Sequence, residues 1–229
     1  MADLDLVIFD CDGTLVDSEF LAAQIESEHL RNAGFDISAE AFAERFAGMT
    51  TKEILFEVER EANIPLQASL LDATQSELDR RIPLEAEAIW GAHEALAKIT
   101  VPMCVCSNSP TERLEAMLLR TRLNSFFGDS IYSSRDVGSG NPKPSPDVFL
   151  HAIDKHDAEA DFTIVIEDSE AGVKGACAAG ARVIGFTGAS HSFPGHADKL
   201  IEAGAETVIS RMSDLPAMLK VLSEWKELK

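Results

Sequence analysis

Ten residues near the start of the chain, Phe9-Asp10-Cys11-Asp12-Gly13-Thr14-Leu15-Val16-Asp17-Ser18, decide how we expect it to fold. They continue an apolar segment, so we expect residues 4–9 to form a buried strand that ends at Asp10. Open α/β folds place their chemistry at the ends of parallel strands. Two carboxylates there, Asp10 and Asp12, can bind a divalent cation and leave one oxygen free as a nucleophile or proton carrier. Taken alone, however, such a pair in an acidic chain is equally well explained by two solvated loop residues.

The composition is that of a globular protein. The chain has 229 residues, of which 45% are hydrophobic, enough to bury a substantial core in one domain or two. No stretch approaches the roughly 18 consecutive apolar residues of a membrane-spanning helix. The first residues are acidic and lead into a strand, unlike the basic and then apolar start of a secretory signal, so we expect a cytoplasmic protein.

The balance of charge excludes several kinds of partner. There are 20 Lys and Arg against 39 Asp and Glu, a formal net charge of −19. We therefore expect no binding to nucleic acid through a basic face and no attraction to a membrane of anionic lipid. An anionic ligand would have to be held by a local cation, because the field of the whole chain repels it. No long apolar or heptad surface stands out, so a monomer is the default expectation.

The four cysteines show no CxxC pair. Cys104 and Cys106 lie two residues apart in an apolar run and should face the same side of a strand. By the same alternation, Cys11 should point away from the two acids beside it. We expect buried free thiols in a reducing compartment rather than disulfides or a zinc site.

Strand and helix patterns alternate along most of the chain, which predicts an α/β fold with a doubly wound parallel sheet and helices on both faces. The expected strands are residues 4–9, 101–106, 130–133, 162–166, 182–186 and 207–209. The expected helices of this core are residues 92–99, 171–179, 196–203 and 214–226, with others starting at Thr111 and after Pro146.

A helical segment interrupts the alternation after the first strand. Between residues 16 and 83 no strand pattern appears, and Asp17 and Ser18 are candidate caps for the first of several helices. The other helices expected there are residues 39–46, 51–62 and 67–82, with Pro65 and Pro83 at the joins. The expected domains are a Rossmann-like catalytic core, residues 1–15 and 84–229, and an all-helical cap domain, residues 16–83.

Four polar motifs lie at the ends of predicted strands or just after them. Because the carboxyl ends of parallel strands meet at one edge of a sheet, we expect the motifs to converge. They are Asp10-Cys11-Asp12-Gly13-Thr14, Ser107-Asn108-Ser109, Lys143-Pro144-Ser145-Pro146-Asp147 and Glu167-Asp168-Ser169, the last followed by Ala171-Gly172.

The residue types in these motifs fit phosphate chemistry. Asp10, Glu167 and Asp168 offer the hard oxygen ligands that suit Mg²⁺. Ser107, with nearby backbone N–H groups, can hold phosphate oxygens, and Lys143 supplies a fixed cation. A carboxylate nucleophile needs a substrate whose charge is neutralised before attack, and Mg²⁺ together with a lysine does this.

A second acid is needed to protonate the leaving alkoxide and later to activate water, and Asp12 is placed for both. Each part also has a structural explanation. Ser107-Asn108-Ser109 could be a polar turn, Lys143 a solvated lysine before a helix start, and Glu167-Asp168 a pair of helix-capping acids. The joint occurrence of the motifs, each tied to a strand end, favours the functional interpretation.

Taken together, the motifs resemble those of the haloacid dehalogenase-like hydrolase superfamily, in the branch with a helical cap after the first strand. That branch includes β-phosphoglucomutase, phosphoglycolate phosphatase and sugar-phosphate phosphatases, and the resemblance covers essentially the whole chain. It implies a phosphatase acting on a small phosphorylated metabolite with Mg²⁺ as cofactor. In the family, the aspartate matching Asp10 forms a phosphoaspartate. The one matching Asp12 is the general acid/base, and its backbone carbonyl ligates Mg²⁺.

The resemblance also assigns roles to the remaining motif residues. Ser107 and Lys143 would bind the phosphoryl group and take part in catalysis, and Asn108 would contact the substrate beside them. Glu167 and Asp168 would complete the metal site. The expected reaction is hydrolysis of a sugar phosphate or a phosphorylated sugar acid.

The presence of Asp12 argues against two other reactions of the superfamily, because its dehalogenases and phosphonate hydrolases lack an aspartate at that position. β-Phosphoglucomutase has a histidine shortly after the first motif and an arginine in the cap. An ungapped alignment places Ala22 and Thr51 there. We therefore expect hydrolysis, with a phosphosugar mutase as the alternative.

Residues 48–52 occupy the position of the cap specificity loop, and two interpretations of them remain open. Thr51 and Lys52 contact the substrate, or Thr50 caps a helix and Lys52 is solvated. Residues 102–110 look like the corresponding run of bacterial phosphatases that act on phosphorylated sugar acids such as phosphogluconate.

Residues 185–191 follow another strand end and are expected to rim the pocket. His191 and His196 are expected to be an ordinary loop residue and a helix-start residue. No histidines have the spacing of a metal-binding pair.

Two other classes of function fit the sequence less well. A signalling receiver domain also phosphorylates an aspartate on a doubly wound sheet, but its lysine follows the last strand, whereas here the late acid pair follows the lysine. A binding protein that has lost catalysis is not supported, because every motif residue that the chemistry needs is present.

Overall fold

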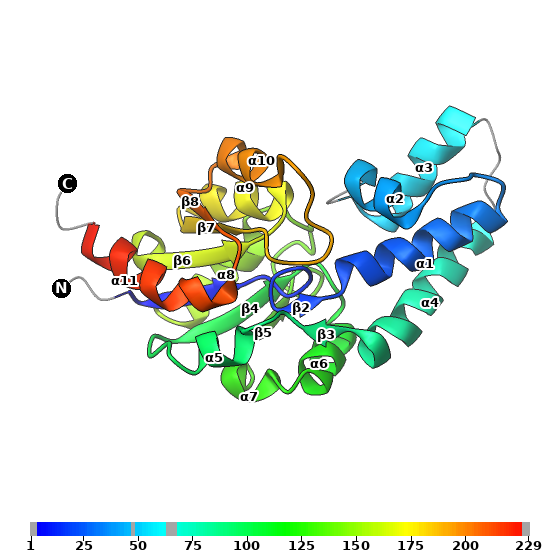
Figure 1. Ribbon diagram of the computed structural model, residues 1–229. Helices are drawn as coiled ribbons and strands as arrows, with labels where there is room; N and C mark the ends of the chain where they lie inside the picture. The colour runs from blue at the N-terminus through cyan, green and yellow to red at the C-terminus, as the bar shows by residue number, and fades with distance from the viewer. Residues whose placement is uncertain (1–3, 47–48, 63–67, 226–229) are drawn as a thin grey trace.

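Six parallel strands form the central sheet, in the order β5-β4-β1-β6-β7-β8. The computed structural model describes residues 4–46, 49–62 and 68–225, and Figure 1 shows its architecture. β1 lies in the middle of the sheet and pairs with β4 on one side and β6 on the other. The strands are β1 Leu6–Phe9, β4 Met103–Ser107, β5 Ile131–Ser133, β6 Thr163–Glu167, β7 Arg182–Phe186 and β8 Thr207–Ile209.

Alternation along β1 gives the sheet two buried faces. Leu6 and Ile8 enter one apolar cluster, and Val7 and Phe9 enter the other. Because both sides of the strand are apolar, helices cover both faces, and the predicted doubly wound α/β core is confirmed. On the Val7 face lie α5 Ala92–Leu96, α6 Thr111–Arg120, α7 Asn124–Phe127 and α11 Leu215–Trp225, and on the Leu6 face lie α8 Asp147–Lys155, α9 Glu170–Ala178 and α10 His196–Ala203. Two 3-10 helices are η1 Ala160–Phe162 and η2 Met212–Asp214.

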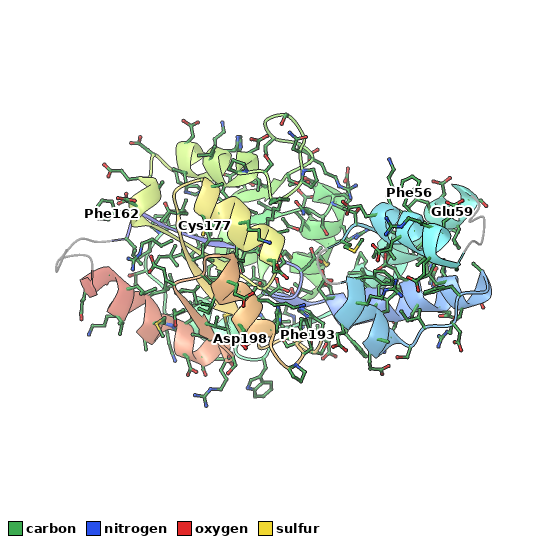
Figure 2. All side chains as sticks on the ribbon, turned by 90° about the horizontal axis from the view of Figure 1, so that it is seen from above. Phe56, Glu59, Phe162, Cys177, Phe193 and Asp198 are labelled. Carbon is green, nitrogen blue, oxygen red and sulfur yellow. The ribbon has the colours of Figure 1, made fainter. Side chains whose placement is uncertain are left out.

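A group of four helices follows the first strands and stands beside the core in both views (Figures 1 and 2). The helices are α1 Glu19–Asn32, α2 Ala39–Phe46, α3 Thr51–Ala62 and α4 Ala68–Glu85. α1, α2 and α3 pack around an apolar cluster of their own that includes Leu30, Phe42 and Val58. Leu78 and Ile82 of α4 belong instead to the core cluster on the Val7 face of the sheet. The inserted all-helical cap is therefore confirmed, while the domain boundaries after residues 15 and 83 stay predictions.

Two short strands join the cap to the core and were not predicted. β2 Val16–Asp17 and β3 Glu87–Ala88 pair antiparallel where the chain leaves the core and returns to it. The expectation of no strand between residues 16 and 83 was wrong at β2, since two-residue strands are too short to show an alternating pattern. The ladder holds the two connections side by side at the base of the cap.

Pro83 does not end the last cap helix, which continues to Glu85. The Ala86 N–H still donates to the Ile82 carbonyl oxygen at 3.0 Å. In the last turn a proline removes one intrahelical hydrogen bond, and the carbonyl that loses it belongs to Asp79, an exposed residue. Three positions of the predicted joins and helix ends lie outside the described residues: Pro65, Gln67 and Lys226.

All four cysteines are free thiols, as predicted, but Cys177 is exposed, whereas buried thiols were expected. Cys104 and Cys106 lie in the same apolar cluster, whereas Cys11 lies in the cluster on the opposite face of the sheet. Among the helices that the structure describes, none combines the length and the apolar character needed to cross a membrane.

Candidate active site

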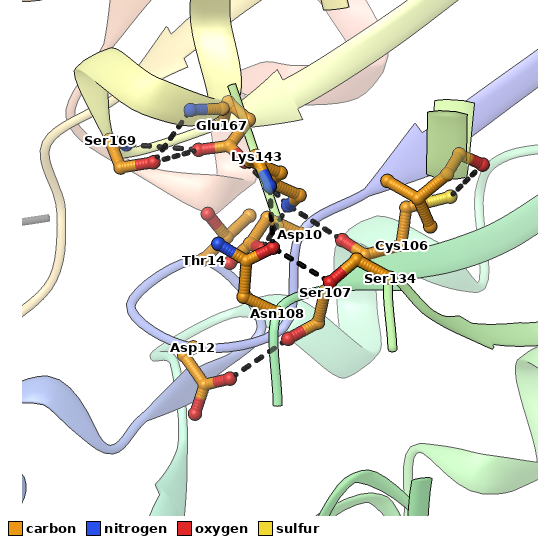
Figure 3. A network of polar contacts seen from close by, with 12 residues as sticks. Asp10, Asp12, Thr14, Cys106, Ser107, Asn108, Ser134, Lys143, Glu167 and Ser169 are labelled. Atoms are coloured by element: carbon orange, nitrogen blue, oxygen red, sulfur yellow. Dashed lines mark hydrogen bonds and ion pairs between the residues drawn. The ribbon is translucent and has the colours of Figure 1, made fainter. Parts of the chain in front are cut away.

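The four sequence motifs meet at the carboxyl edge of the sheet (Figure 3). Asp10 follows β1, Ser107 ends β4, and Glu167 ends β6. Strand pairing fixes their relative positions, and the Asp10 N–H donates to the Ile166 carbonyl oxygen at 3.0 Å. Lys143 reaches the same edge from the loop before α8. The convergence expected from a parallel sheet is therefore observed.

Lys143 connects two of the motif carboxylates. Its ammonium group donates to Asp10 Oδ1 at 2.5 Å, to Glu167 Oε1 at 2.7 Å and to the Cys106 carbonyl oxygen at 2.8 Å. All three ammonium donors are thus in use, and the residue is only 6% exposed. Burial alone would lower the pKa of Lys143, but the two carboxylates outweigh it and raise the pKa above its ordinary value. Lys143 is a fixed positive charge.

Asp10 lies buried among other carboxylates and lines the cavity. Lys143 binds its Oδ1, and its Oδ2 has no hydrogen-bond partner among the described residues. Burial raises the pKa of Asp10 well above its ordinary value; Lys143 opposes this, and the charges of Glu167, Asp168 and Asp12 add to it. One oxygen is therefore held in place while the other is available for chemistry.

Asp12 is held by hydroxyl groups from two separate segments. Ser18 Oγ donates to Asp12 Oδ1 at 2.7 Å, and Ser107 Oγ and Ser109 Oγ donate to Oδ2 at 3.1 and 2.8 Å. Ser18 stands at the start of α1, as predicted, but its hydroxyl makes no capping hydrogen bond. It serves the carboxylate instead, and the position of Asp12 is fixed from both sides.

The side chain of Asn108, in the loop after β4, binds the backbone of Lys143. Asn108 Oδ1 accepts hydrogen bonds from the Lys143 N–H at 2.8 Å and from Ser134 Oγ at 3.0 Å. The Asn108 amide nitrogen has no acceptor among the residues described, so its two N–H groups remain available. The Ser109 N–H donates to Ser107 Oγ at 3.0 Å. The two predicted substrate-binding residues of this loop, Ser107 and Asn108, lie on the same edge as Lys143.

Glu167 is fully buried and is held from two sides. Besides Lys143, the Ser169 N–H and hydroxyl both donate to its Oε2 at 2.9 Å. Glycine is required opposite this carboxylate, because a Cβ on Gly172 would lie 1.7 Å from Glu167 Oε1. The α9 helix therefore packs its first turn directly against the carboxylate.

Asp168 is held by two side chains, one of which we had assigned no role. Thr14 Oγ1 donates to Asp168 Oδ1 at 3.1 Å, and His191 Nε2 contacts Oδ2 at 3.0 Å. Gly13, with φ +79°, allows this approach, since a Cβ there would lie 2.2 Å from the same Oδ2. Burial would lower the pKa of His191, but Asp168 outweighs it and raises the pKa to about 9. His196 Nε2 contacts the Asp168 carbonyl oxygen at 2.7 Å.

The sequence therefore missed two histidines that lie against a predicted metal ligand. His191 lies in the loop after β7 and His196 begins α10, as expected, but neither was expected to contact Asp168. Both line the cavity, and the rim expected from residues 185–191 is present at His191. A lone histidine in a loop carries no spacing signal, so only the fold could bring it to Asp168.

The oxygen donors fit a divalent cation, although the side chains as they stand form no ready cage. Within residues 4–46, 49–62 and 68–225, no three His, Cys, Asp or Glu side chains are grouped as a metal site. Lys143 and His191 occupy carboxylate oxygens that a metal would use. The mutual repulsion of Asp10, Asp12 and Asp168 is nevertheless what a hard cation relieves. The assignment of the four acids as metal ligands stays a prediction.

A cavity of about 940 Å³ lies between the cap and this edge of the sheet. Among its described lining residues are seven Lys and Arg and eight Asp and Glu. The chain as a whole has 20 against 39, so the cavity is locally far less repulsive to an anion than the chain's net charge suggests. Phe193, on the loop before α10, is one of the lining residues, and Figure 2 shows it on the side of the core that faces the cap helices.

The capping interpretation of the cap loop is confirmed, and contact of Thr51 and Lys52 with the substrate stays a prediction. Thr50 and Glu53 form a capping box at the start of α3: the Thr50 N–H donates to Glu53 Oε2 at 2.7 Å, and the Glu53 N–H donates to Thr50 Oγ1 at 3.3 Å. Thr51 and Lys52 both line the cavity. Lys52 is exposed, with its ammonium 5.9 Å from the centre of the Phe56 ring. Gly48, the first residue of the predicted loop, lies outside the described residues.

Comparison with known proteins gives relatives along nearly the full length. The 6-phosphogluconate phosphatase of Escherichia coli strain K12 is 30% identical over 221 residues, which are 96% of each chain. A conserved haloacid dehalogenase-like protein of unknown function from Agrobacterium tumefaciens is 54% identical. Its structure has a TM-score of 0.92 and covers 96% of this chain and 99% of its own.

A second solved structure adds to this likeness. A haloacid dehalogenase family hydrolase from Deinococcus radiodurans, with bound phosphate and sodium, is 31% identical with a TM-score of 0.80 over 96% of each chain. The family model described as haloacid dehalogenase-like hydrolase matches residues 7–186. The resemblance noted in the four motifs is thereby confirmed, and the chain belongs to the haloacid dehalogenase-like hydrolase family.

Proposed function

We propose that the protein is a Mg²⁺-dependent phosphatase that transfers the phosphoryl group of a small phosphate monoester to Asp10 and then to water. The observation that carries this proposal is the difference in hydrogen bonding between the two carboxylate oxygens of Asp10. Lys143 holds one of its oxygens at 2.5 Å, while the other has no partner among the described residues. A buried carboxylate in that state is suited to act as a nucleophile.

In the first step, Asp10 Oδ2 attacks phosphorus, and the bond from phosphorus to the leaving oxygen breaks. Asp12 gives its proton to that oxygen, so the alcohol leaves neutral. In the second step, Asp12 takes a proton from a water molecule that attacks the phosphoaspartate. Inorganic phosphate leaves, and both aspartates return to their starting state.

The surrounding hydroxyls support this role of Asp12. A serine hydroxyl can donate a hydrogen bond or, after rotation, accept one. Ser18, Ser107 and Ser109 can therefore hold Asp12 as a carboxylate and as a carboxylic acid without moving its oxygens. Such preorganised support suits a group that changes its protonation state twice in a cycle.

Phosphoryl oxygens would be bound by the free amide N–H of Asn108 and by the loop of Ser107. Lys143, whose three donors are already in use, would offset their negative charge from beside Asp10. When bound, Mg²⁺ supplies positive charge that offsets the charge of the phosphoryl group and the acids. Asp10, the Asp12 backbone carbonyl and Asp168 would hold it. Glu167, whose oxygens accept hydrogen bonds from Lys143 and Ser169, would complete the site.

The substrate class follows from the cavity and the relatives. A cavity of about 940 Å³ suits a small metabolite. The Escherichia coli relative is named as a phosphatase of 6-phosphogluconate. We propose a sugar phosphate or a phosphorylated sugar acid as substrate, in the cytoplasm. The mutase alternative is weaker, because Ala22 and Thr51 line the cavity where that reaction would require a histidine and an arginine.

The test is hydrolysis of an aryl phosphate with Mg²⁺, with EDTA and by Asp10→Asn. We expect metal-dependent turnover by the wild type and a loss of about 10⁴-fold or more in Asp10→Asn, because an amide cannot act as the nucleophile. Asp198→Asn, the same change at an exposed position on α10, is the control and should match the wild type. Turnover that persists in Asp10→Asn would exclude the phosphoaspartate.

A further inference from the structure

One face of α1 forms a wall of the cavity and carries two carboxyl groups that the proposed reaction does not use. Glu19, Ala22, Ala23 and Glu26 all line the cavity. They recur at the spacing of one helical face, and the rise of 1.5 Å per residue separates the two glutamates by about 10 Å along the axis. The two alanines between them leave room for a ligand against the helix.

Glu26, at the outer end of this row, is oriented by the cap loop. Thr51 Oγ1 donates to Glu26 Oε1 at 2.6 Å. Its other oxygen has no hydrogen-bond partner among the described residues. Arg113, on the core helix α6, also affects Glu26 electrostatically, but its side chain donates to Asp79 Oδ1, from Nε at 2.9 Å and from Nη2 at 2.6 Å. Glu26 therefore has acceptor capacity that no described residue uses.

Glu19, at the inner end, makes no hydrogen bond to a described residue. Neither carboxyl stabilises the fold by its charge. Burial raises the pKa of Glu26 to about 7, against the effects of Thr51 and Arg113. Burial, together with Asp12, raises the pKa of Glu19 to about 8. A neutral side chain would suit both positions better if packing alone decided them.

The chemistry of these acids restricts what they can bind. A second anionic group of a substrate would have to lie away from the row, toward cations that also line the cavity, such as Arg45 and Lys52. Alcohol groups fit, because a hydroxyl donates to a carboxylate and accepts from a carboxylic acid, so it pairs with either form. A chain that carries several hydroxyls can meet both glutamates while its phosphate lies at Asp10.

We propose that Glu26, oriented by Thr51, and Glu19 bind hydroxyl groups of the substrate and so select a phosphorylated polyol or sugar chain over a phosphate monoester without hydroxyls. This inference rests on the phosphatase function proposed above. It assigns Glu26 as a specificity-determining residue on the cap and Thr51 as the residue that positions it.

The test compares two esters of equal carbon number, a hexitol 6-phosphate and hexyl phosphate. The wild type should show the higher kcat/KM for the hexitol ester. Glu26→Leu removes both acceptor oxygens at similar volume and should reduce the ratio of the two kcat/KM values by about tenfold or more, because the hydrogen bonds between Glu26 and the substrate hydroxyls are lost for one ester only. Glu28→Leu, at an exposed position on α1, is the matched control and should leave the ratio unchanged.

Two further variants guard against a purely structural effect. Glu26→Gln keeps part of the hydrogen bonding and Thr51→Val frees Glu26 to rotate, so both should give intermediate ratios. A ratio that Glu26→Leu leaves at the wild-type value would overturn the inference even when hydrolysis itself is confirmed.

Absence of hydrolysis of both esters by the wild type would contradict the proposed function instead. Calorimetric titration of the Mg²⁺-loaded protein with the same two esters then decides the inference on its own. Tighter binding of the hexitol ester that is lost in Glu26→Leu supports it, and equal affinities for the two esters refute it.

Discussion

The two ends of the cavity differ in how completely their acids are bound. At the core end, Lys143 joins Asp10 to Glu167, and three serine hydroxyls surround Asp12. At the cap end, Glu26 has one hydrogen bond and Glu19 has none to a described residue. The core end is thus organised before any substrate arrives, as electrostatic catalysis requires. The cap end keeps unused hydrogen-bonding capacity, which suits recognition.

The elements behind the two ends explain the contrast. The core acids stand at the ends of buried parallel strands, where pairing to both neighbours fixes the backbone. The cap acids stand on one partly exposed helix face, positioned by a single contact from α3. Chemistry is therefore tied to the sheet, and specificity to a helix that can vary without disturbing it.

The largest effect on stability is expected from removing the buried cation of the core end. Lys143→Met leaves Asp10 and Glu167 without their shared partner, so the free energy of unfolding should fall by about 3–5 kcal/mol at pH 7. Chemical denaturation in EDTA measures it. Lys174→Met, which removes an exposed ion pair to Glu170, is the control and should cost no more than about 1 kcal/mol. Equal losses in the two variants would show that the core end is not organised by Lys143.

A smaller effect is expected on the proton transfers. Asp12→Asn should reduce turnover of an alkyl phosphate by about 100-fold or more, because the alkoxide then leaves without a proton. With an aryl phosphate the leaving group needs no proton, so release of about one equivalent of phenol should precede slow turnover. Stopped-flow absorbance measures this burst. Equal losses for both esters and no burst would assign the proton transfer to another residue.

The smallest effect is expected at the cap end, in the pH dependence of stability. The pKa of Glu26 is raised from 4.5 to about 7 in the folded protein, so the folded state keeps a proton that the unfolded chain releases. The stabilisation this provides is complete below about pH 4.5 and is lost as the pH rises through about 7. Glu26→Gln should therefore be more stable than the wild type by about 1–2 kcal/mol at pH 8, allowing for partial exposure, and little different at pH 4.5.

Denaturant titrations at the two pH values check this difference. Glu28→Gln removes the same charge from an exposed position of α1 and should not change the pH dependence. If Glu26→Gln shows no gain at pH 8, the carboxyl is solvated, and its proposed role in hydroxyl recognition weakens with it.

The core end could be predicted from the sequence because its signals are local. Apolar runs such as residues 4–9 and 162–166 mark buried strands, and each is followed at once by acids. The topology of a parallel sheet then brings Asp10 and Asp168 to one edge without further information. Lys143 was found through its proline-rich motif, although its exact partners needed the fold.

The remaining features of the site and the fold could not be predicted, because they depend on contacts or short elements that leave no local pattern in the sequence. Glu26 looks like any acid of an amphipathic helix until Thr51 and the cavity are placed beside it. His191 meets Asp168 only through the loop after β7. The two-residue strands β2 and β3 and the four-residue helix α7 are too short to show periodicity.

Trapping the covalent intermediate tests the role of Asp10 most directly. Asp12→Asn is mixed with an aryl phosphate and Mg²⁺, quenched in acid and digested, and the peptides are examined by mass spectrometry. We expect about one phosphoryl group per chain on the peptide that contains Asp10. We expect none in the double variant that carries Asp10→Asn as well as Asp12→Asn. Consumption of the aryl phosphate in a single turnover with no phosphoryl group on the protein, or with the group on another residue, would contradict a phosphoaspartate at Asp10.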